Sequence, residues 1–552
     1  MRKGFTIQDL SLWQPWARRL AAAVLCALAA PHPAHAQAQP FDLVLRNARI
    51  VDGSGRAAYR GDIAIRGDSI ARIAPSIADP ATRVIDVASQ VVAPGFIDVH
   101  NHGRVGIFRL PTADNLVRQG ITTVIEGPDG SSPVPLAPFL KRLAALKKSI
   151  NFGTFIGHGS VRDHVMGKAD RHAAPEELTQ MQAVVEQAMK DGAFGLSSGL
   201  IYIPGKFAPT SELVELAKIV GRLGGHYQSH IRDEGNRVVE AVQEAIAIGE
   251  QAGLPTQITH HKTILQRNWG KSVDTLRLIS AARARGLDVT IDQYPFTSTG
   301  ASFPTYFPAW AQDGGLQSLR ARLKDENLRA KIKAHTIRIL RFGASRGDLT
   351  KIVLAQCYWD RSLAGKSLAD VVRLRGTAMT VENGAEAVFW IIESGGCEAV
   401  VRDSLSEDDI ERILAHPATM VASDGNIPGP IIDIVSGVPH PRSFGAFPRV
   451  LGHYVRERKV LKLEEAVHKM TASPAQRLGL DDRGIIREGM KADLVVFDPE
   501  RVRDTATLDD PKQFPEGIPI VIVNGEIVFE SGAMTTARPG RVLYGRGAVS
   551  KN

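Results

Sequence analysis

The chain has 552 residues, a formal net charge of +8 and 44% hydrophobic residues. This composition is typical of a globular protein with a sizeable core, and the three cysteines exclude a fold stapled by disulfides. The sequence has no run of basic residues and no stripe of alternating aromatic and basic residues, so it gives little support to nucleic-acid binding.

Residues 1–36 have the organisation of a signal peptide. Arg18 and Arg19 precede an apolar run from Leu20 to Ala30, and Ala34-His35-Ala36 is a small-x-small cleavage site. This run is too short to span a membrane, and no later stretch is long and apolar enough. We therefore expect a cleaved, periplasmic or secreted protein without membrane contact, exported by either the Sec or the twin-arginine route. The mature chain keeps Cys357 and Cys397, which allow one disulfide without requiring it.

Short alternating segments typical of β-strands occur at both ends of the mature chain. They cover residues 41–46, 62–65, 84–87 and 91–93 near the start, and 492–497, 518–523 and 527–529 near the end. Because chain termini often lie close together in compact proteins, residues 37–94 and 481–552 are predicted to pair into one small β-sandwich.

Between these ends, short apolar runs alternate with helical stretches such as Thr210–Leu223 and Val238–Ala252. Alternation of this kind predicts an α/β fold with a parallel sheet, and eight runs favour a closed (β/α)8 barrel over residues 95–480. The last gap is too long for one crossover, so we predict an inserted lobe at about 300–400, between the last two barrel strands. The eight runs are Gly95–Val99, Ile121–Ile125, Phe152–Ile156, Ala193–Ser197, His226–Ser229, Thr256–Thr259, Asp288–Ile291 and Thr419–Ser423.

Histidines stand at or just beyond the ends of several of these runs. His100 and His102 follow the first run one residue apart, so on a strand their side chains face the same way. Two imidazoles at one strand end predict a metal site, at the end of the barrel where such folds keep their chemistry. For an isolated His-x-His, two hydrogen-bonded surface histidines are the commoner arrangement. The further groups at run ends are His158, His230, His260, His261 and Asp424.

Eight motifs, in one order over essentially the whole mature chain, carry a resemblance to a known family. They are Ala93-Pro94-Gly95-Phe96-Ile97-Asp98-Val99-His100-Asn101-His102, Gly120-Ile121-Thr122-Thr123-Val124, Gly157-His158-Gly159-Ser160-Val161-Arg162, Gly195-Leu196-Ser197-Ser198-Gly199-Leu200, Ser229-His230-Ile231-Arg232-Asp233-Glu234, Thr259-His260-His261-Lys262, Ser423-Asp424-Gly425 and His440-Pro441-Arg442-Ser443-Phe444-Gly445. In these motifs the chain resembles the N-acyl-D-amino-acid deacylases (D-aminoacylases) of the amidohydrolase superfamily. The resemblance implies a metal-dependent (β/α)8 barrel with a small β-sandwich.

The resemblance also implies the metal ligands. His230 and His260 match the tight ligands of the family, and His100 and His102 match its ligands for a second site. D-aminoacylases commonly place a cysteine where Asp129 stands. A carboxylate is a competent zinc ligand and can bridge two metals, although Asp129 in Pro128-Asp129-Gly130 could instead only cap a turn. We expect one or two divalent ions, Zn²⁺ first, with Mn²⁺ or Co²⁺ as alternatives because oxygen is a harder ligand than sulfur.

Further roles follow from the same matches. Asp424 would be the general base and acid, placed to take a proton from water and return it to the leaving nitrogen. Lys262, Tyr294 and Arg442 would bind the α-carboxylate of the substrate, with Arg442 as a bidentate fork. His158 and His261 would support the ligands or polarise the substrate carbonyl.

The expected activity is metal-dependent hydrolysis of N-acyl-D-amino acids, small-molecule substrates, to a carboxylate and a free D-amino acid. Two alternatives within the superfamily are hydrolysis of cyclic amides, as in dihydroorotases and hydantoinases, and hydrolysis of dipeptides with a C-terminal D-residue. An alternative of another class is a catalytically silent, metal-binding scaffold. The preferred side chain, the acyl group and the oligomeric state stay open at this point.

Overall fold

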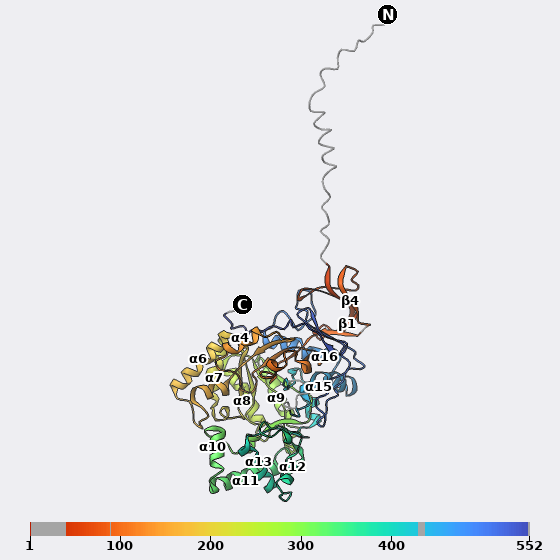
Figure 1. The fold of residues 1–552 in the computed structure, drawn as a ribbon. Helices are drawn as coiled ribbons and strands as arrows, with labels where there is room; N and C mark the ends of the chain where they lie inside the picture. The colour runs from red at the N-terminus through yellow and green to blue at the C-terminus, as the bar shows by residue number, and fades with distance from the viewer. Residues whose placement is uncertain (2–39, 89, 429–436, 550–552) are drawn as a thin grey trace.

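The computed structural model describes residues 40–88, 90–428 and 437–549, together with Met1. Apart from Met1, the predicted signal peptide therefore lies outside the described residues. Figure 1 shows three regions in a row: a sheet formed at the chain termini, a central body, and a lobe at the opposite end. Within the described ranges, no helix is long and apolar enough to cross a membrane.

All eight apolar runs predicted as strands are strands, and each pairs in parallel with its neighbours. One sheet has the order β6 (Phe96–Asp98), β7 (Ile121–Glu126), β8 (Asn151–Thr154). The other has the order β17 (Thr419–Val421), β13 (Val289–Gln293), β12 (Thr256–Ile258), β11 (His226–His230), β10 (Gly195–Gly199), β9 (Ile156–Gly157). β8 and β9 belong to one predicted run, which is interrupted at Phe155.

Amphipathic helices separate the parallel strands and cover them. In α7 (Thr210–Arg222) the buried residues Leu213, Leu216, Ala217 and Val220 recur at helical spacing, so one stripe faces the core. The helix α8 (Val238–Ala252) is followed by Gly253, whose φ of +67° is the left-handed conformation that glycine adopts most readily at a helix C-terminus. The main helices of the body are α4 (Ala137–Ala145), α5 (His158–Met166), α6 (Pro175–Asp191), α7 (Thr210–Arg222), α8 (Val238–Ala252), α9 (Ser272–Ala284), α14 (Glu407–Ala415), α15 (Arg442–Arg449), α16 (Leu463–Met470) and α17 (Ala472–Leu478).

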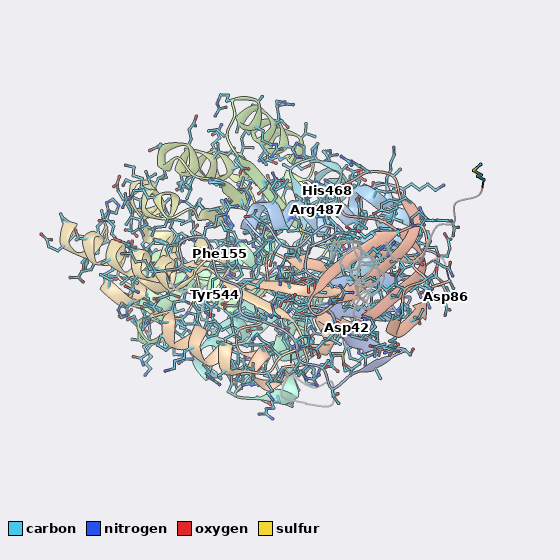
Figure 2. All side chains as sticks on the ribbon, turned by 90° about the horizontal axis from the view of Figure 1, so that it is seen from above. Asp42, Asp86, Phe155, His468, Arg487 and Tyr544 are labelled. Atoms are coloured by element: carbon cyan, nitrogen blue, oxygen red, sulfur yellow. A yellow bond between two sulfur atoms is a disulfide. The ribbon has the colours of Figure 1, made fainter. Side chains whose placement is uncertain are left out.

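Strands from both ends of the chain pair in one nine-stranded sheet. β5 and β18 join its two halves antiparallel, with Val92 opposite Val496. In the view from above, Asp42 and Asp86 mark this sheet on one side of the molecule, and Phe155 and Tyr544 lie toward the other side (Figure 2). Its order is β21 (Ala533–Met534), β20 (Glu526–Glu530), β19 (Ile520–Val523), β18 (Leu494–Phe497), β5 (Val91–Pro94), β1 (Phe41–Ile50), β2 (Tyr59–Arg66), β3 (Ser69–Ala74), and β4 (Ala81–Asp86) also pairs with β1.

The lobe lies between β13 and β17 in the sequence and has its own apolar core. Its basic helical stretch, predicted from Leu316 to Ile339, forms two helices. A further helix, α12 (Leu368–Leu374), starts at a capping box, in which the side chains of Ser367 and Asp370 each accept a hydrogen bond from the backbone N–H of the other. The lobe contains the antiparallel sheet β14 (Thr299–Ser302), β16 (Glu398–Val401), β15 (Ile352–Gln356) and the helices α10 (Gly315–Arg322), α11 (Glu326–Phe342), α12 (Leu368–Leu374) and α13 (Val381–Ser394).

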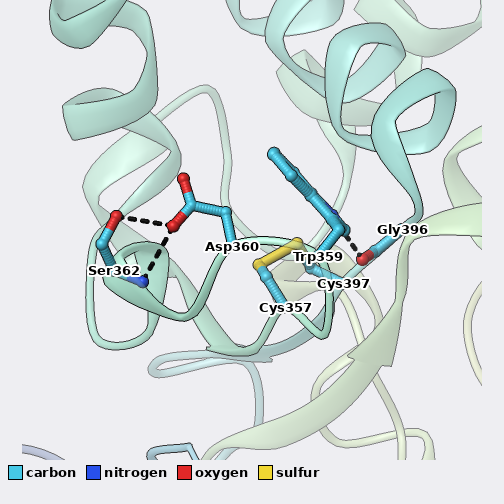
Figure 3. The surroundings of a disulfide bond; sticks show 6 residues. All are labelled: Cys357, Trp359, Asp360, Ser362, Gly396 and Cys397. Atoms are coloured by element: carbon cyan, nitrogen blue, oxygen red, sulfur yellow. Dashed lines mark hydrogen bonds between the residues drawn. A yellow bond between two sulfur atoms is a disulfide. The ribbon is translucent and has the colours of Figure 1, made fainter.

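A disulfide between Cys357 and Cys397 joins the end of β15 to the start of β16 (Figure 3). The indole N–H of Trp359 donates a hydrogen bond of 3.0 Å to the carbonyl of Gly396 beside it. The two cysteines that the sequence left free to pair are therefore paired.

Candidate metal centre

The predicted metal ligands lie at the carboxyl ends of the parallel strands. These ends meet at one edge of a parallel sheet, so residues far apart in the sequence converge there. His100 and His102 follow β6, Asp129 follows β7, His230 ends β11, His260 follows β12 and Asp424 follows β17.

Asp129 occupies the middle of this cluster. Its Oδ1 lies 3.6 Å from Nε2 of His100 and 3.5 Å from both Nδ1 of His230 and Nε2 of His260. Its Oδ2 lies 3.6 Å from Nε2 of His102. One carboxylate thus connects two groups of donor atoms, each group lying within 4.8 Å: His100, His102, Asp129 and Asp424 in one, and Asp129, His230 and His260 in the other.

Three residues of the cluster have an unusual backbone conformation. Asp129, His260 and Asp424 have φ values of +57°, +32° and +48°, in the region that non-glycine residues seldom adopt. The segment around Asp129 is also a turn, because the N–H of Ser131 donates to the carbonyl of Pro128 at 3.1 Å. The sequence left two roles open for Asp129, a residue that forms a turn and a carboxylate directed at the histidines. The structure shows both features at this position.

The donor atoms suit a divalent cation. Both ring nitrogens of His100, Nε2 of His230 and Oδ1 of Asp129 are buried and have no hydrogen-bond partner among the described residues. Buried polar atoms in proteins nearly always have a partner, so such a set needs an explanation. Converging imidazole nitrogens and carboxylate oxygens are the ligands that zinc and similar ions take.

The charges in the cluster keep both carboxylates ionised. Burial raises the pKa of Asp129, but His100, His260 and His230 outweigh it and hold that pKa well below its usual range. Burial is the largest influence on His230 and its pKa is lowered overall, the direction that favours the neutral imidazole, which is the form that binds a metal.

Two carboxylates that the sequence did not single out support the histidines. Oδ1 of Asp292 accepts a hydrogen bond of 2.8 Å from the N–H of His260 and lies 3.6 Å from Nδ1 of His100. Oε1 of Glu234 lies 3.2 Å from Nδ1 of His260. Asp292 could have been found as a charged residue in a largely buried strand, and Glu234 as the residue four positions after His230.

The predicted catalytic and substrate-binding residues lie beside the cluster. Oδ1 of Asp424 is 3.0 Å from Nε2 of His102, and Oδ2 is 2.6 Å from Nη1 of Arg442. The Arg442 guanidinium stacks over the ring of Tyr294, 4.6 Å from its centroid. The Tyr294 hydroxyl is buried without a hydrogen-bond partner among the described residues. Nζ of Lys262 donates to Oε1 of Glu234 at 2.5 Å.

Two predicted residues face away from the cluster. Nε2 of His158 lies 2.8 Å from Oε1 of Glu212 on α7. Nε2 of His261 lies 2.8 Å from Oγ1 of Thr275 on α9, and burial lowers the pKa of His261 to about 4. An aromatic ring that the sequence did not single out is closer, because the ring of Tyr202 lies 4.8 Å from that of His230.

Parallel βα units with paired groups of metal-ligand atoms at the carboxyl ends of the strands are the arrangement of a metal-dependent enzyme, in which a bound ion can activate water. A family model described as the amidohydrolase family matches residues 83–529, and the chain belongs to this family. Its relatives place it with the N-acyl-D-amino-acid deacylases. It is 35% identical to D-aminoacylase of Alcaligenes xylosoxydans xylosoxydans, over 92% of this chain and 98% of that protein. It is 34% identical to N-acyl-D-glutamate deacylase of the same organism, over 92% of this chain and 97% of that one.

The structure is also similar to a solved one. The crystal structure of N-acyl-D-glutamate deacylase from Bordetella bronchiseptica was determined with zinc and a phosphonate inhibitor, described as a mimic of the tetrahedral intermediate. Its TM-score with this chain is 0.77 at 31% sequence identity, over 92% of this chain and 100% of that one.

Proposed function

We propose that this protein hydrolyses the amide bond of N-acyl-D-amino acids to give a carboxylate and a free D-amino acid. The observation that carries the proposal is the contact of Arg442 with Asp424 beside two groups of metal-ligand atoms. One carboxylate, one cation and a metal site then lie within reach of a single small substrate. The relatives named above, at 34–35% identity, are deacylases of this type.

The resident cofactor is proposed to be one or two divalent ions, Zn²⁺ first and Mn²⁺ or Co²⁺ as alternatives. His230 and His260 would hold one ion, His100 and His102 the other, and Asp129 both, because its Oδ1 faces His100, His230 and His260 and its Oδ2 faces His102. A divalent ion there supplies a Lewis acid for the amide carbonyl and makes water more acidic.

Asp424 is proposed to move the proton. It is ionised and held by His102 and Arg442, so it can accept the proton of the attacking water at Oδ1. The same atom then delivers the proton to the amide nitrogen, which leaves as an amine. Because one carboxylate both accepts and donates the proton, no second residue is needed as a general acid.

Arg442, Tyr294 and Lys262 are proposed to bind the α-carboxylate of the substrate. The stacking of Arg442 on Tyr294 fixes the guanidinium, and the Tyr294 hydroxyl, which has no partner among the described residues, can donate a hydrogen bond. When the α-carboxylate and the scissile carbonyl are both fixed, the side chain and the hydrogen at Cα occupy defined places, and these places are exchanged in the opposite enantiomer. Selectivity for D-substrates follows if the place that the side chain of an L-substrate would take is too small for it.

The finer features of the fold belong to the same proposal. We infer a closed barrel, because β8 and β9 are parts of one run and a parallel bridge between Asn101 and Gly425 follows β6 and β17. The small β-sandwich is supported by one apolar cluster that contains Ile63 and Ile522, from distant strands of the terminal sheet. The lobe would then cover the mouth of the barrel.

Export to the periplasm or the medium is proposed as well. It rests on the signal-like residues 1–36 and on the pairing of Cys357 with Cys397, because disulfides persist mainly in oxidising compartments.

The deciding experiment compares turnover of N-acetyl-D-leucine and N-acetyl-L-leucine by the mature protein, with metal content measured on the same sample. We expect turnover of the D-substrate only, and a fall in kcat of about 10²–10⁴-fold in Asp424→Asn with metal content unchanged. Turnover of a hydantoin or of glycyl-D-leucine in place of the N-acetyl substrate would assign one of the alternative activities. Metal binding without any turnover would assign the scaffold.

A further inference from the structure

The three-stranded sheet of the lobe has two different faces. Ala301 and Ala399, which are opposite each other on β14 and β16, pack into the apolar core of the lobe. Because side chains alternate along a strand, the flanking pairs face the other way. These pairs are Gly300 with Val400 and Ser302 with Glu398.

This second face is directed at the substrate site. A Cβ atom added to Gly300 would lie 3.1 Å from Nη2 of Arg442, the proposed ligand of the substrate carboxylate. Glu398 is two residues along β16 from the partner of Gly300, which corresponds to about 7 Å on the same face. The lobe therefore presents a carboxylate next to the proposed clamp.

The carboxylate of Glu398 has no hydrogen-bond or ion-pair partner among the described residues. The residue is exposed at the surface of the lobe, but the atoms around its carboxyl group partly desolvate it and raise its pKa, and the positive charges of His102 and Arg442 lower that pKa in part. Glu398 thus lies within electrostatic reach of both ends of the proposed substrate without being neutralised by either cation.

The disulfide holds this carboxylate and an aromatic ring at one place. Cys397 immediately precedes Glu398, and Cys357 immediately precedes Tyr358, whose relative exposure is 68%. Burial and the charge of Glu398 raise the pKa of Tyr358, and the charge of Arg109 opposes them, so Glu398 and Tyr358 lie within electrostatic reach of each other. A carboxylate beside an exposed aromatic ring is a good environment for an ammonium or guanidinium group.

We propose that Glu398 is a specificity-determining residue that favours substrates with a cationic group extending from the metal centre toward the lobe, and disfavours substrates with a second carboxylate there. The proposal rests on the proposed deacylase function and names its substrate class. The cation could be the side chain of a D-lysine or D-arginine residue, or the free ammonium of an aminoacyl group. These sources share one chemistry and are separated by the test.

The test compares pairs of substrates that differ in one charge. N-acetyl-D-lysine and N-acetyl-D-norleucine probe the side chain, and glycyl-D-leucine and N-acetyl-D-leucine probe the acyl group. We expect kcat/KM to be about tenfold higher for the cationic member of one of these pairs, and lowest for N-acetyl-D-glutamate. In Glu398→Gln the preference within that pair should fall about tenfold, and the relative rate with N-acetyl-D-glutamate should rise.

A matched variant is available in the same lobe. Glu393 lies on α13 and pairs with Arg329 at 2.8 Å, so Glu393→Gln makes the same charge change away from this face and should leave the preference unchanged. The proposal is overturned if the wild-type protein treats both members of each pair alike, or if Glu398→Gln keeps the wild-type preference. A preference for N-acetyl-D-glutamate also overturns it. Failure to cleave any N-acyl-D-amino acid would instead reject the deacylase function itself.

Discussion

Nη1 of Arg442 lies 2.6 Å from Oδ2 of Asp424, so the proposed substrate clamp and the proposed proton carrier share one ion pair. Burial raises the pKa of Asp424, but Arg442, followed by His100, lowers it well below its usual range. Arg442 therefore affects both the binding of the substrate and the protonation state of Asp424.

Substitution of this arginine should have two separable effects. In Arg442→Gln, kcat/KM for N-acetyl-D-leucine should fall about 10–100-fold, because a hydrogen-bonded charge pair with the substrate is lost. Loss of the cation also raises the pKa of Asp424, so the acidic limb of the pH profile should move to higher pH. Steady-state kinetics between pH 4 and pH 9 measure both effects.

The control for this variant removes an arginine outside the site. Arg402 pairs with Asp509 at 2.6 Å, and Arg402→Gln should leave the profile in place. An amide substrate without a carboxylate, N-acetyl-D-leucinamide, should be turned over equally by the wild-type protein and by Arg442→Gln at pH values above the acidic limb of both profiles. Equal losses with both substrates would show that Arg442 does not bind the carboxylate.

Asp129 can be tested by metal content. In Asp129→Ala the metal bound per chain should fall by about one equivalent, because an anionic ligand shared between two groups of histidines is removed. Asp129→Cys should keep the metal and, after dialysis against equal Zn²⁺ and Mn²⁺, retain more Zn²⁺ than the wild-type protein, because thiolate is the softer ligand. Mass spectrometry of the dialysed proteins gives both numbers. Unchanged metal content in Asp129→Ala would leave Asp129 with its turn-forming role alone.

Much of the fold was predictable because periodicity is a local property of the sequence. The parallel strands, which arise from eight short apolar runs, and helices such as α7 and α8 follow from local patterns in the sequence. Strand order is not local. The pairing of β5 with β18 depends on contacts between opposite ends of the chain, and β3 and β21 are too weakly patterned to be predicted.

The same distinction applies to the site. The predicted ligands converge because each stands at a strand end, a position that can be read from the sequence. Asp292 and Glu234 have signals of their own in the sequence, but their contacts with His260 appear only in the folded structure. The reverse holds for His261, which is adjacent to His260 in the sequence but faces Thr275. The side chains of neighbouring residues in a turn can point in different directions, and the sequence alone does not show which of them points at the metal ligands.

The disulfide of the lobe should contribute measurably to stability. Cys357 and Cys397 are 40 residues apart, and closing a loop of that length in the unfolded chain corresponds to about 4 kcal/mol in the chain-entropy treatment. The double variant Cys357→Ser, Cys397→Ser should therefore lower the melting temperature and speed hydrogen exchange in β15 and β16. Reducing agent should reproduce the effect in the wild-type protein and change nothing further in the variant. Identical melting with and without reductant would show that the lobe does not depend on the bond.

A buried ion pair between α5 and α7 gives the last prediction. Glu212 on α7 accepts a hydrogen bond from Arg162 and lies 2.8 Å from His158, and its side chain is only 3% exposed. Glu212→Gln leaves the Arg162 charge buried without its partner, which costs about 3–5 kcal/mol of unfolding free energy. Glu177→Gln makes the same chemical change. It should alter stability far less, because Glu177 pairs with Arg171 near the surface.

The pH dependence of this pair has a definite sign. Burial raises the pKa of Glu212, but His158 and Arg162 outweigh it and lower that pKa below its ordinary value of 4.5. A carboxyl whose pKa is lower in the folded state stabilises the protein above its unfolded pKa, and this contribution is lost as the pH falls through the folded value. The difference in stability between wild-type protein and Glu212→Gln should therefore be constant from pH 8 to pH 6 and shrink below about pH 4. Thermal unfolding across this range measures it, and a difference that grows on acidification would contradict the assigned direction of the Glu212 shift.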